Sequence, residues 1–426
     1  MLKSAPFILG LAAALGSTDA PEDAPRDPAV RSAIVRTAGR FDLIRDGRPF
    51  FVKGAGGADH LDQLAAAGGN SIRTWGVGKG TEKLLDQAHA AGLTVTLGIW
   101  LERVGTGFDY GSKDAIARQT KMVREAVERY RGHPALLMWS LGNEGEGHGD
   151  DPRYYEHLEA LATMVHELDP DHPTMTVIAE LGEGGRKVKD LERLAPSIDA
   201  VGINSYGGIR SIPRRYREAG GTRPYLITEF GPKGHWESPR TDWGTPIELS
   251  STEKADLYRS AYQAAVAGQP TCIGAYVFLW GQKQETTATW FGMYLEDGTR
   301  LGAVDVMTEL WSGEAPENRA PEIGALEISR ASVSPGAIIE ATLEARDVDS
   351  DELQVEWVLR SASPGNGSWG AREGSLEEFP EAILAGKRAR AKVRMPRRPG
   401  PYRLFAYVRD GAGNGAVHNV PLRVVE

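Results

Sequence analysis

The sequence predicts an α/β protein, a (β/α)8 TIM barrel followed by a C-terminal β-sandwich. From Phe50 to about Trp311, eight short apolar runs alternate with stretches of helical periodicity, which indicates parallel strands joined by crossover helices. Eight such units in about 260 residues is the usual size of this barrel. After Trp311 the helical patterns stop, and alternating apolar and polar residues separated by turn residues predict a second, all-β domain.

The predicted barrel strands and helices follow one another in strict order. The strands are FFVKGAG, SIRTWG, TVTLGIW, LLMWSLGNE, TMTVIAE, AVGINSYG, YLITEFG and GAYVFLWG. The predicted helices include Asp59–Ala67, Glu82–Ala91, Asp114–Tyr130, Tyr154–Leu168 and Thr252–Ala267. A doubly wound open sheet is the alternative, but it needs a glycine-rich nucleotide turn. The stretch Gly54–Gly57 does not match that fingerprint.

Changes of composition divide the chain into five segments. A positive residue, a short apolar run (Ala5–Leu15) and small residues ending at Ala20 predict a signal peptide, and therefore a secreted or periplasmic protein. Phe41–Pro49 is predicted to form a hairpin before the first barrel strand. The predicted segments are 1–20 signal peptide, 21–40 spacer, 41–312 catalytic barrel, 313–321 linker and 322–426 β-sandwich.

Composition and charge exclude several classes of function. The chain is 41% hydrophobic and 25% charged, with a net charge of −9, and its Lys and Arg residues form no basic face for nucleic acid. No segment after the N-terminal run is long and apolar enough to span a membrane. Because Cys272 is the only cysteine, no intrachain disulfide or cysteine-based zinc site can form, and we expect a buried structural thiol.

Two glutamates stand where apolar strands end. Leu136–Leu141 breaks into Gly142, Asn143 and Glu144, and Tyr225–Thr228 breaks at Glu229. A charged side chain at the carboxyl end of a buried barrel strand usually has a functional role. Two such carboxylates facing one pocket are the minimal equipment for cleaving a glycosidic bond, so Glu144 and Glu229 are the predicted catalytic residues.

Other strand ends supply polar and aromatic residues that suit a sugar, whose rings have apolar faces and polar rims. The predicted substrate-binding residues are Arg73, Trp75, Asn143, Asn204, Tyr206 and Trp280. Trp100 and Glu102 follow the third strand, and Glu102 and Glu146 are expected as acids at the rim. Tyr206 and Trp280 have an alternative interpretation as aromatic residues of the barrel core.

These motifs resemble the retaining glycosidases of clan A. The run WSLGNE at the fourth strand and LITEFG at the seventh are similar to those of the glycoside hydrolase family 2 catalytic barrel. The resemblance covers roughly Phe41–Trp311. It implies that Glu144 is the acid/base, Glu229 the nucleophile, Asn143 a partner of the substrate 2-hydroxyl, and Arg73 an organiser of the nucleophile. It implies no cofactor and no metal.

The chain departs from family 2 because a β-sandwich follows the barrel and few residues precede it. A bare barrel resembles β-glucan hydrolases and transglycosylases, so a β-linked glucan is the favoured substrate. Trp290, Phe291 and Tyr294 are expected to line an open cleft for a sugar chain. Two alternatives stay open: an exo-acting β-galactosidase, β-mannosidase or β-glucuronidase, and a non-catalytic carbohydrate-binding barrel.

The C-terminal domain resembles immunoglobulin-like or PKD-like modules of secreted carbohydrate enzymes. It is a candidate for contact with polysaccharide or a cell surface. Asp347, Asp349 and Asp351 alternate there, and carboxylates at alternate positions can bind calcium. Because the EF-hand spacing fails, a solvated acidic turn is the favoured interpretation, with calcium as the alternative.

Overall fold

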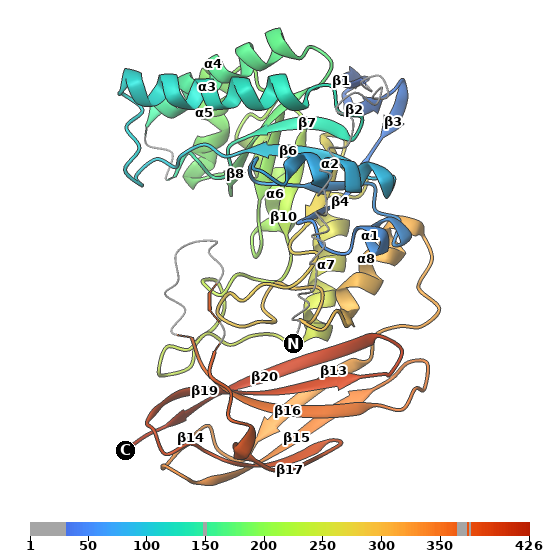
Figure 1. Cartoon of the computed structure of the whole chain (residues 1–426), viewed down its shortest axis with the longest axis vertical. Helices are drawn as coiled ribbons and strands as arrows, with labels where there is room; N and C mark the ends of the chain where they lie inside the picture. The colour runs from blue at the N-terminus through green and yellow to red at the C-terminus, as the bar shows by residue number, and fades with distance from the viewer. Residues whose placement is uncertain (1–30, 148–150, 364–372, 375) are drawn as a thin grey trace, which may run out of the picture.

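The structure of the 426-residue chain is a computed structural model that describes residues 31–147, 151–363, 373–374 and 376–426 (Figure 1). The predicted signal peptide, 1–20, and the first half of the predicted spacer lie outside the described residues. Within those ranges, no helix combines the length and the apolar character that crossing a membrane requires.

A small antiparallel sheet precedes the barrel. It consists of β1 (Ser32–Thr37), β2 (Arg40–Arg45) and β3 (Arg48–Phe50), and the predicted hairpin turn lies at Asp46 and Gly47, which both have positive φ. The predicted spacer therefore ends too late, because β1 lies inside it. The reason is packing: Ile34 pairs with Leu43, and both contact the apolar residues at the N-terminal ends of the barrel strands.

Eight parallel strands close into a barrel, as predicted, in the order β10-β11-β4-β5-β6-β7-β8-β9. Their bounds are β4 (Val52–Gly56), β5 (Ser71–Arg73), β6 (Thr94–Ile99), β7 (Leu136–Leu141), β8 (Thr174–Ala179), β9 (Ala200–Asn204), β10 (Tyr225–Phe230) and β11 (Cys272–Val277). All residues of β6, β7, β9, β10 and β11 are buried, as expected for strands covered on both faces.

Helices cover the outside of the barrel and supply the crossovers (Figure 1). They are α1 (Leu61–Ala66), α2 (Thr81–Ala90), α3 (Lys113–Tyr130), α4 (Pro152–Leu168), α5 (Arg186–Leu194), α6 (Ile212–Glu218), α7 (Ser251–Ala265) and α8 (Gly302–Ser312), with short 3-10 turns at Glu183–Gly185 and Ile209–Ser211. The predicted helix start before Thr252 is a capping box, in which Ser250 and Glu253 bond to each other's backbone N–H groups. Burial raises the pKa of the Cys272 thiol to about 12, which fits its structural role.

The C-terminal part consists of two sheets that share one apolar core. One sheet contains β13 (Glu322–Ile328), β15 (Ile338–Arg346), β17 (Ile383–Lys387) and β18 (Arg390–Arg394). The other contains β12 (Arg300–Leu301), β14 (Ser332–Val333), β16 (Gln354–Ser361), β19 (Gly400–Arg409) and β20 (Asn414–Val424), with a 3-10 turn at Pro380–Ala382 nearby. Leu343, Leu359 and Leu404 from both sheets belong to the shared core. The immunoglobulin-like topology stays a prediction.

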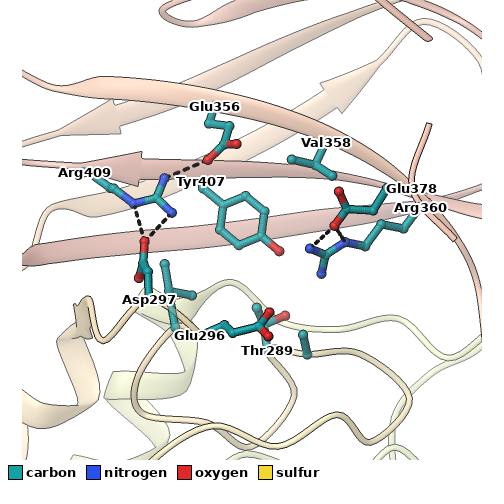
Figure 2. Close-up of a pocket in the computed structure, with 11 residues that line it drawn as sticks. Thr289, Glu296, Asp297, Glu356, Val358, Arg360, Glu378, Tyr407 and Arg409 are labelled. Carbon is teal, nitrogen blue, oxygen red and sulfur yellow. Dashed lines mark hydrogen bonds and ion pairs between the residues drawn. The ribbon is translucent and has the colours of Figure 1, made fainter. Parts of the chain in front are cut away.

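The barrel and the second sheet are joined by a seam of buried polar residues. Glu248, after β10, accepts hydrogen bonds from Lys254 of α7, from Thr287 and Thr289, and from Asn419 of β20. Beside it, a cavity of about 310 Å³ separates the loop before α8 from β16 and β19 (Figure 2). Tyr407 lies in this cavity between the ion pairs of Arg360 with Glu378 and of Arg409 with Asp297 and Glu356.

Candidate active site

The predicted catalytic residues stand at the carboxyl ends of their strands. Glu144 follows β7, and Glu229 is the fifth residue of β10. Arg73 ends β5 and Asn204 ends β9, so side chains from four strands meet at one mouth of the barrel. Gly142 permits the turn after β7, because it has a φ of 78° and an added Cβ would lie 3.1 Å from the hydroxyl of Tyr154.

Glu229 is held by three donors. Arg73 Nη1 donates to Oε1 over 3.0 Å, and Trp75 Nε1 donates to the same oxygen over 2.8 Å. Tyr206 donates its hydroxyl to Oε2 over 2.9 Å. The carboxylate is therefore fixed in orientation, with a fully buried guanidinium supplying the matching positive charge. All three donors were among the residues predicted from the sequence.

Glu144 has a different environment. It accepts one hydrogen bond from the described residues, from Asn204 Nδ2 to Oε1 over 2.9 Å. Burial and then the nearby charge of Glu229 raise the pKa of Glu144 to about 7, while the bond from Asn204 opposes that rise. Its backbone has a φ of 53°, a left-handed conformation that is uncommon outside glycine and that recurs at functional sites.

Asn143 connects the two carboxylates. Its Oδ1 accepts a 2.6 Å hydrogen bond from Arg73 Nη2 and a 3.2 Å bond from Asn204 Nδ2. Thr228 in turn donates to Asn204 Oδ1 over 2.8 Å, which fixes the orientation of that amide. Because Oδ1 of Asn143 is occupied, its Nδ2 is the atom that remains for a substrate oxygen.

An aromatic cluster borders Glu229, and part of it was missed by sequence reasoning. The ring of Tyr206 packs against Phe278, Phe291 and Trp236 at centroid distances of 6.1, 5.5 and 5.6 Å. Trp75 meets Phe278 edge to face at 6.0 Å. Burial, followed by the charge of Glu229, raises the pKa of Tyr206 well above its usual value, so the phenol stays a donor. Phe278 directly follows β11, which is the signal that would have identified it.

Three sequence expectations need correction. Trp280 is 1% exposed and packs against Tyr294 and Trp311 in the barrel core, so its alternative interpretation as a core residue holds. Trp290, Phe291 and Tyr294 are also buried, and they do not line an open cleft. Trp280 packs against Trp311 of α8 and Tyr294 stacks on His60 before α1, whereas Trp290 packs against His235 and donates to the backbone oxygen of Lys233.

Glu146 is likewise no rim acid, although Glu102 is exposed as expected. Glu146 is buried, and its Oε1 accepts from Lys187 Nζ over 2.6 Å and from the backbone of Ala179 over 3.1 Å. The buried lysine compensates its charge, which makes it a structural pair under the site. Its negative charge contributes to the raised pKa of Glu144.

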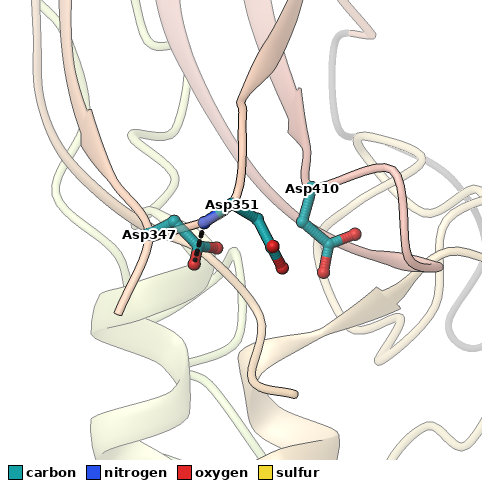
Figure 3. Close-up of side chains that lie close together, drawn as sticks. All are labelled: Asp347, Asp351 and Asp410. Carbon is teal, nitrogen blue, oxygen red and sulfur yellow. Dashed lines mark hydrogen bonds between the residues drawn. The ribbon is translucent and has the colours of Figure 1, made fainter. Parts of the chain in front are cut away.

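The acidic turn of the C-terminal part forms a cluster different from the predicted one. Asp347 and Asp351 lie beside Asp410, and one carboxylate oxygen of each lies within 4.8 Å of the others (Figure 3). Asp349 instead bonds to Arg319, and both oxygens of Asp410 accept hydrogen bonds from the turn that ends at Asn414. Oxygen ligands of this kind suit calcium, but the hydrogen bonds equally explain the cluster as a structural turn.

Comparisons with known proteins agree with the motifs. Residues 91–235 match the family described as "Glycosyl hydrolases family 2, TIM barrel domain", so the predicted resemblance to that barrel is confirmed. A β-glucuronidase of Streptococcus agalactiae is 24% identical over 176 residues, which cover 38% of this chain and 28% of that protein. The β-glucuronidase of Homo sapiens is 31% identical over 86 residues, covering 20% and 12%.

Solved structures share the fold. A β-D-glucuronidase of Dictyoglomus thermophilum superposes with a TM-score of 0.53 at 18% identity, covering 67% of this chain and 54% of that one. Bacteroides uniformis β-glucuronidase 2 gives a TM-score of 0.53 at 13% identity, covering 92% and 48%. The chain thus spans about half the length of these solved structures and less of the sequence relatives.

Proposed function

We propose that this chain is a retaining β-glycosidase that acts by double displacement. One observation carries the proposal: two carboxylates share the mouth of the barrel in contrasting environments. Glu144 has a pKa raised to about 7, which suits a proton donor, whereas Glu229 is oriented by Arg73, Trp75 and Tyr206. Pairs of titratable groups whose environments differ in this way usually divide the roles of acid and nucleophile.

In the proposed first step, a Glu229 oxygen attacks the anomeric carbon while Glu144 gives its proton to the departing glycosidic oxygen. The C–O bond breaks, and a glycosyl-enzyme ester forms on Glu229. In the second step, the Glu144 carboxylate takes a proton from water or from the hydroxyl of an acceptor sugar. That oxygen attacks the anomeric carbon and releases Glu229. Asn143 Nδ2 is positioned to donate to the 2-hydroxyl throughout, where hydrogen bonds strengthen in the transition state.

Two substrate classes are supported by different observations. A β-linked glucan chain is favoured by the exposed indoles of Trp100 and Trp236, whose apolar faces suit the rings of successive sugars, and it leaves both hydrolysis and transglycosylation open. A β-glucuronide is favoured by the names of the sequence relatives. A uronide carboxylate requires a cation; Arg103, whose charge lowers the pKa of Glu144, is near enough to be tested for that role. Two other cations of this region, Arg73 and Lys283, are paired with Glu229 and Glu285, so the neutral β-glucan is proposed first and the β-glucuronide, with Arg103 as its test residue, second.

The test is a product profile by mass spectrometry on β-1,3-, β-1,4- and β-1,6-glucans, mannan, galactan and an aryl β-glucuronide. Shorter products indicate a hydrolase, and products longer than the substrate indicate a transglycosylase. Proton NMR of the first product formed reports the anomer, and retention is expected. Glu229→Ala should abolish every product, whereas Glu102→Gln, which changes an exposed acid of the same rim, should not. If wild type matches Glu229→Ala on every substrate, the chain is a carbohydrate-binding barrel and the proposal is wrong.

Export of the protein is a further proposal, which rests on residues 1–20. Cell fractionation of the full chain, with Edman or mass-spectrometric identification of the new N-terminus, is the direct check. Recovery of the uncleaved chain with cytoplasmic proteins would contradict it.

A further inference from the structure

Two tryptophans at the barrel mouth are exposed to an unusual degree. Trp100 is 46% exposed and Trp236 is 42% exposed, and among the large hydrophobic side chains that the described residues leave exposed, these two alone are aromatic. Burying an indole removes more apolar surface from water than burying almost any other side chain, so leaving one open is costly unless a ligand covers it. Phe278 and Phe291, which also border the site, are buried, and Trp75 and Tyr206 are partly buried.

The two indoles come from opposite sides of the barrel ring. Trp100 follows β6, and Trp236 lies in the loop after β10, two strands that are four places apart in the ring of eight. A Cβ added at Gly76 would lie 3.5 Å from Trp100 Cβ, so Trp100 packs beside the segment that carries Trp75. On the other side, the ring of Trp236 meets that of Tyr206 edge to face at 5.6 Å.

Each indole therefore neighbours one of the groups that hold the nucleophile. Trp75 donates to Oε1 of Glu229 and Tyr206 donates to Oε2. Because the loops after β6 and β10 face each other across the barrel ring, a sugar chain with one unit in reach of Glu229 can extend towards Trp100 at one end and towards Trp236 at the other. The apolar face of a pyranose matches an indole face, and its hydroxyls stay free to contact water at the rim.

We infer that Trp100 and Trp236 are sugar-binding platforms on the two sides of the cleaved bond, and that the substrate is a chain of several sugars bound across the barrel mouth. This inference rests on the proposed function and deepens it, because it assigns endo-type binding of an oligosaccharide or polysaccharide rather than capture of one terminal sugar. The packing of Trp236 against His235, at 4.9 Å, and against Phe291, at 6.1 Å, gives that platform a fixed orientation.

The experiment compares kcat/KM for an aryl monoglycoside with that for the matching β-linked oligosaccharides, from the disaccharide to the hexasaccharide. Wild type should gain with chain length, because contacts remote from the cleaved bond stabilise the transition state. Trp100→Ala and Trp236→Ala should each lower kcat/KM for the hexasaccharide about tenfold or more, the usual loss for a buried tryptophan contact, with little change for the monoglycoside. Trp100→Phe and Trp236→Phe, which keep an aromatic face, should restore part of the loss.

A control separates the platforms from general surface effects. Met122→Ala changes a similarly exposed apolar residue on the outer face of α3 and should leave the chain-length dependence unchanged. Equal loss on the monoglycoside and the hexasaccharide in both tryptophan variants would overturn the inference while leaving the proposed activity intact.

Failure of the proposed function gives a different result, namely no turnover of any substrate by wild type. Binding then decides the inference: titration calorimetry of the Glu229→Gln protein with the hexasaccharide and disaccharide should show tighter binding of the longer chain. That difference should be lost in the Trp100→Ala and Trp236→Ala backgrounds. Equal affinity for both lengths, or affinity unchanged by the two substitutions, would contradict the platforms.

Discussion

Two glutamates, Glu248 in a buried position and Glu144 in a partly buried one, show how one type of side chain serves two purposes in this molecule. Glu248, at the seam between the barrel and the C-terminal sheets, accepts from Lys254 and Thr289 at Oε1 and from Thr287 and Asn419 at Oε2. Glu144, at the barrel mouth, accepts one hydrogen bond from the described residues. Both carboxylate oxygens of Glu248 therefore accept hydrogen bonds from the protein, whereas the carboxyl group of Glu144 keeps the capacity to bond a substrate.

The pKa values follow from this difference. Burial alone would raise the pKa of Glu248, but Lys254 and Arg403 beside it outweigh burial and lower it, so this group is charged and structural. Burial and the charge of Glu229 together raise the pKa of Glu144 to about 7. For these two acids, the incompletely bonded carboxylate of Glu144 has the raised pKa that suits proton transfer, and the fully bonded carboxylate of Glu248 has the lowered pKa of a structural charge.

The strongest test of this contrast is the pair Glu144→Gln and Glu248→Gln. Removing the proton donor should lower kcat on substrates with poor leaving groups by about 10² to 10⁴-fold, the usual contribution of a general acid. Glu248→Gln should leave kcat of the folded protein near wild type. Steady-state kinetics at pH 6, with folding checked by circular dichroism, compare the two. A similar loss of kcat in both variants would contradict the division of roles.

Substitutions in the seam around Glu248 should change the free energy of unfolding rather than kcat. Lys254→Met leaves the buried Glu248 without its cation, which should lower the free energy of unfolding by about 3–5 kcal/mol. The lowered pKa of Glu248 stabilises wild type above its unfolded value of 4.5, and this stabilisation is lost as the pH falls. The difference between wild type and Lys254→Met should therefore be largest near pH 7 and shrink below pH 4.5. Urea unfolding across that range measures it; a difference that does not depend on pH would contradict the charge argument.

A smaller effect is expected from Asn204→Ala. The bond from Asn204 lowers the pKa of Glu144, so its loss should raise that pKa further and move the alkaline limb of the kcat/KM profile to higher pH. Thr163→Ala, which changes an exposed hydroxyl on the outer helix α4, is the control. A limb that stays in place would show that Asn204 positions Glu144 without tuning its protonation.

The sequence predicted the barrel well because its strands are short apolar runs between helical stretches, and burial on both faces makes such runs easy to recognise. It also identified the contacts of Glu229, since Arg73, Trp75 and Tyr206 all sit at strand ends. It failed for Trp280 and Glu146, whose sites depend on how long loops fold back onto the core. The ring of Trp280 packs against Tyr294, and Glu146 pairs with Lys187 of α5. Both contacts depend on the tertiary structure, so no local sequence pattern predicts them.

Arg409 offers the smallest and most specific test of the seam. It donates to Asp297 of the barrel loop and to Glu356 of β16, at the edge of the cavity in Figure 2, and its side chain is 30% exposed. Because water screens partly exposed ion pairs, Arg409→Ala should cost no more than about 1 kcal/mol, against several for Lys254→Met. The loss should diminish in high salt, whereas that of Lys254→Met should not, since buried charges are screened much less. If the two variants lost equal free energy of unfolding, or if their losses depended equally on salt, the exposed and buried parts of the seam would form one network. The hydrogen bonds of Glu248 alone would then not account for the stability of the contact between the two domains.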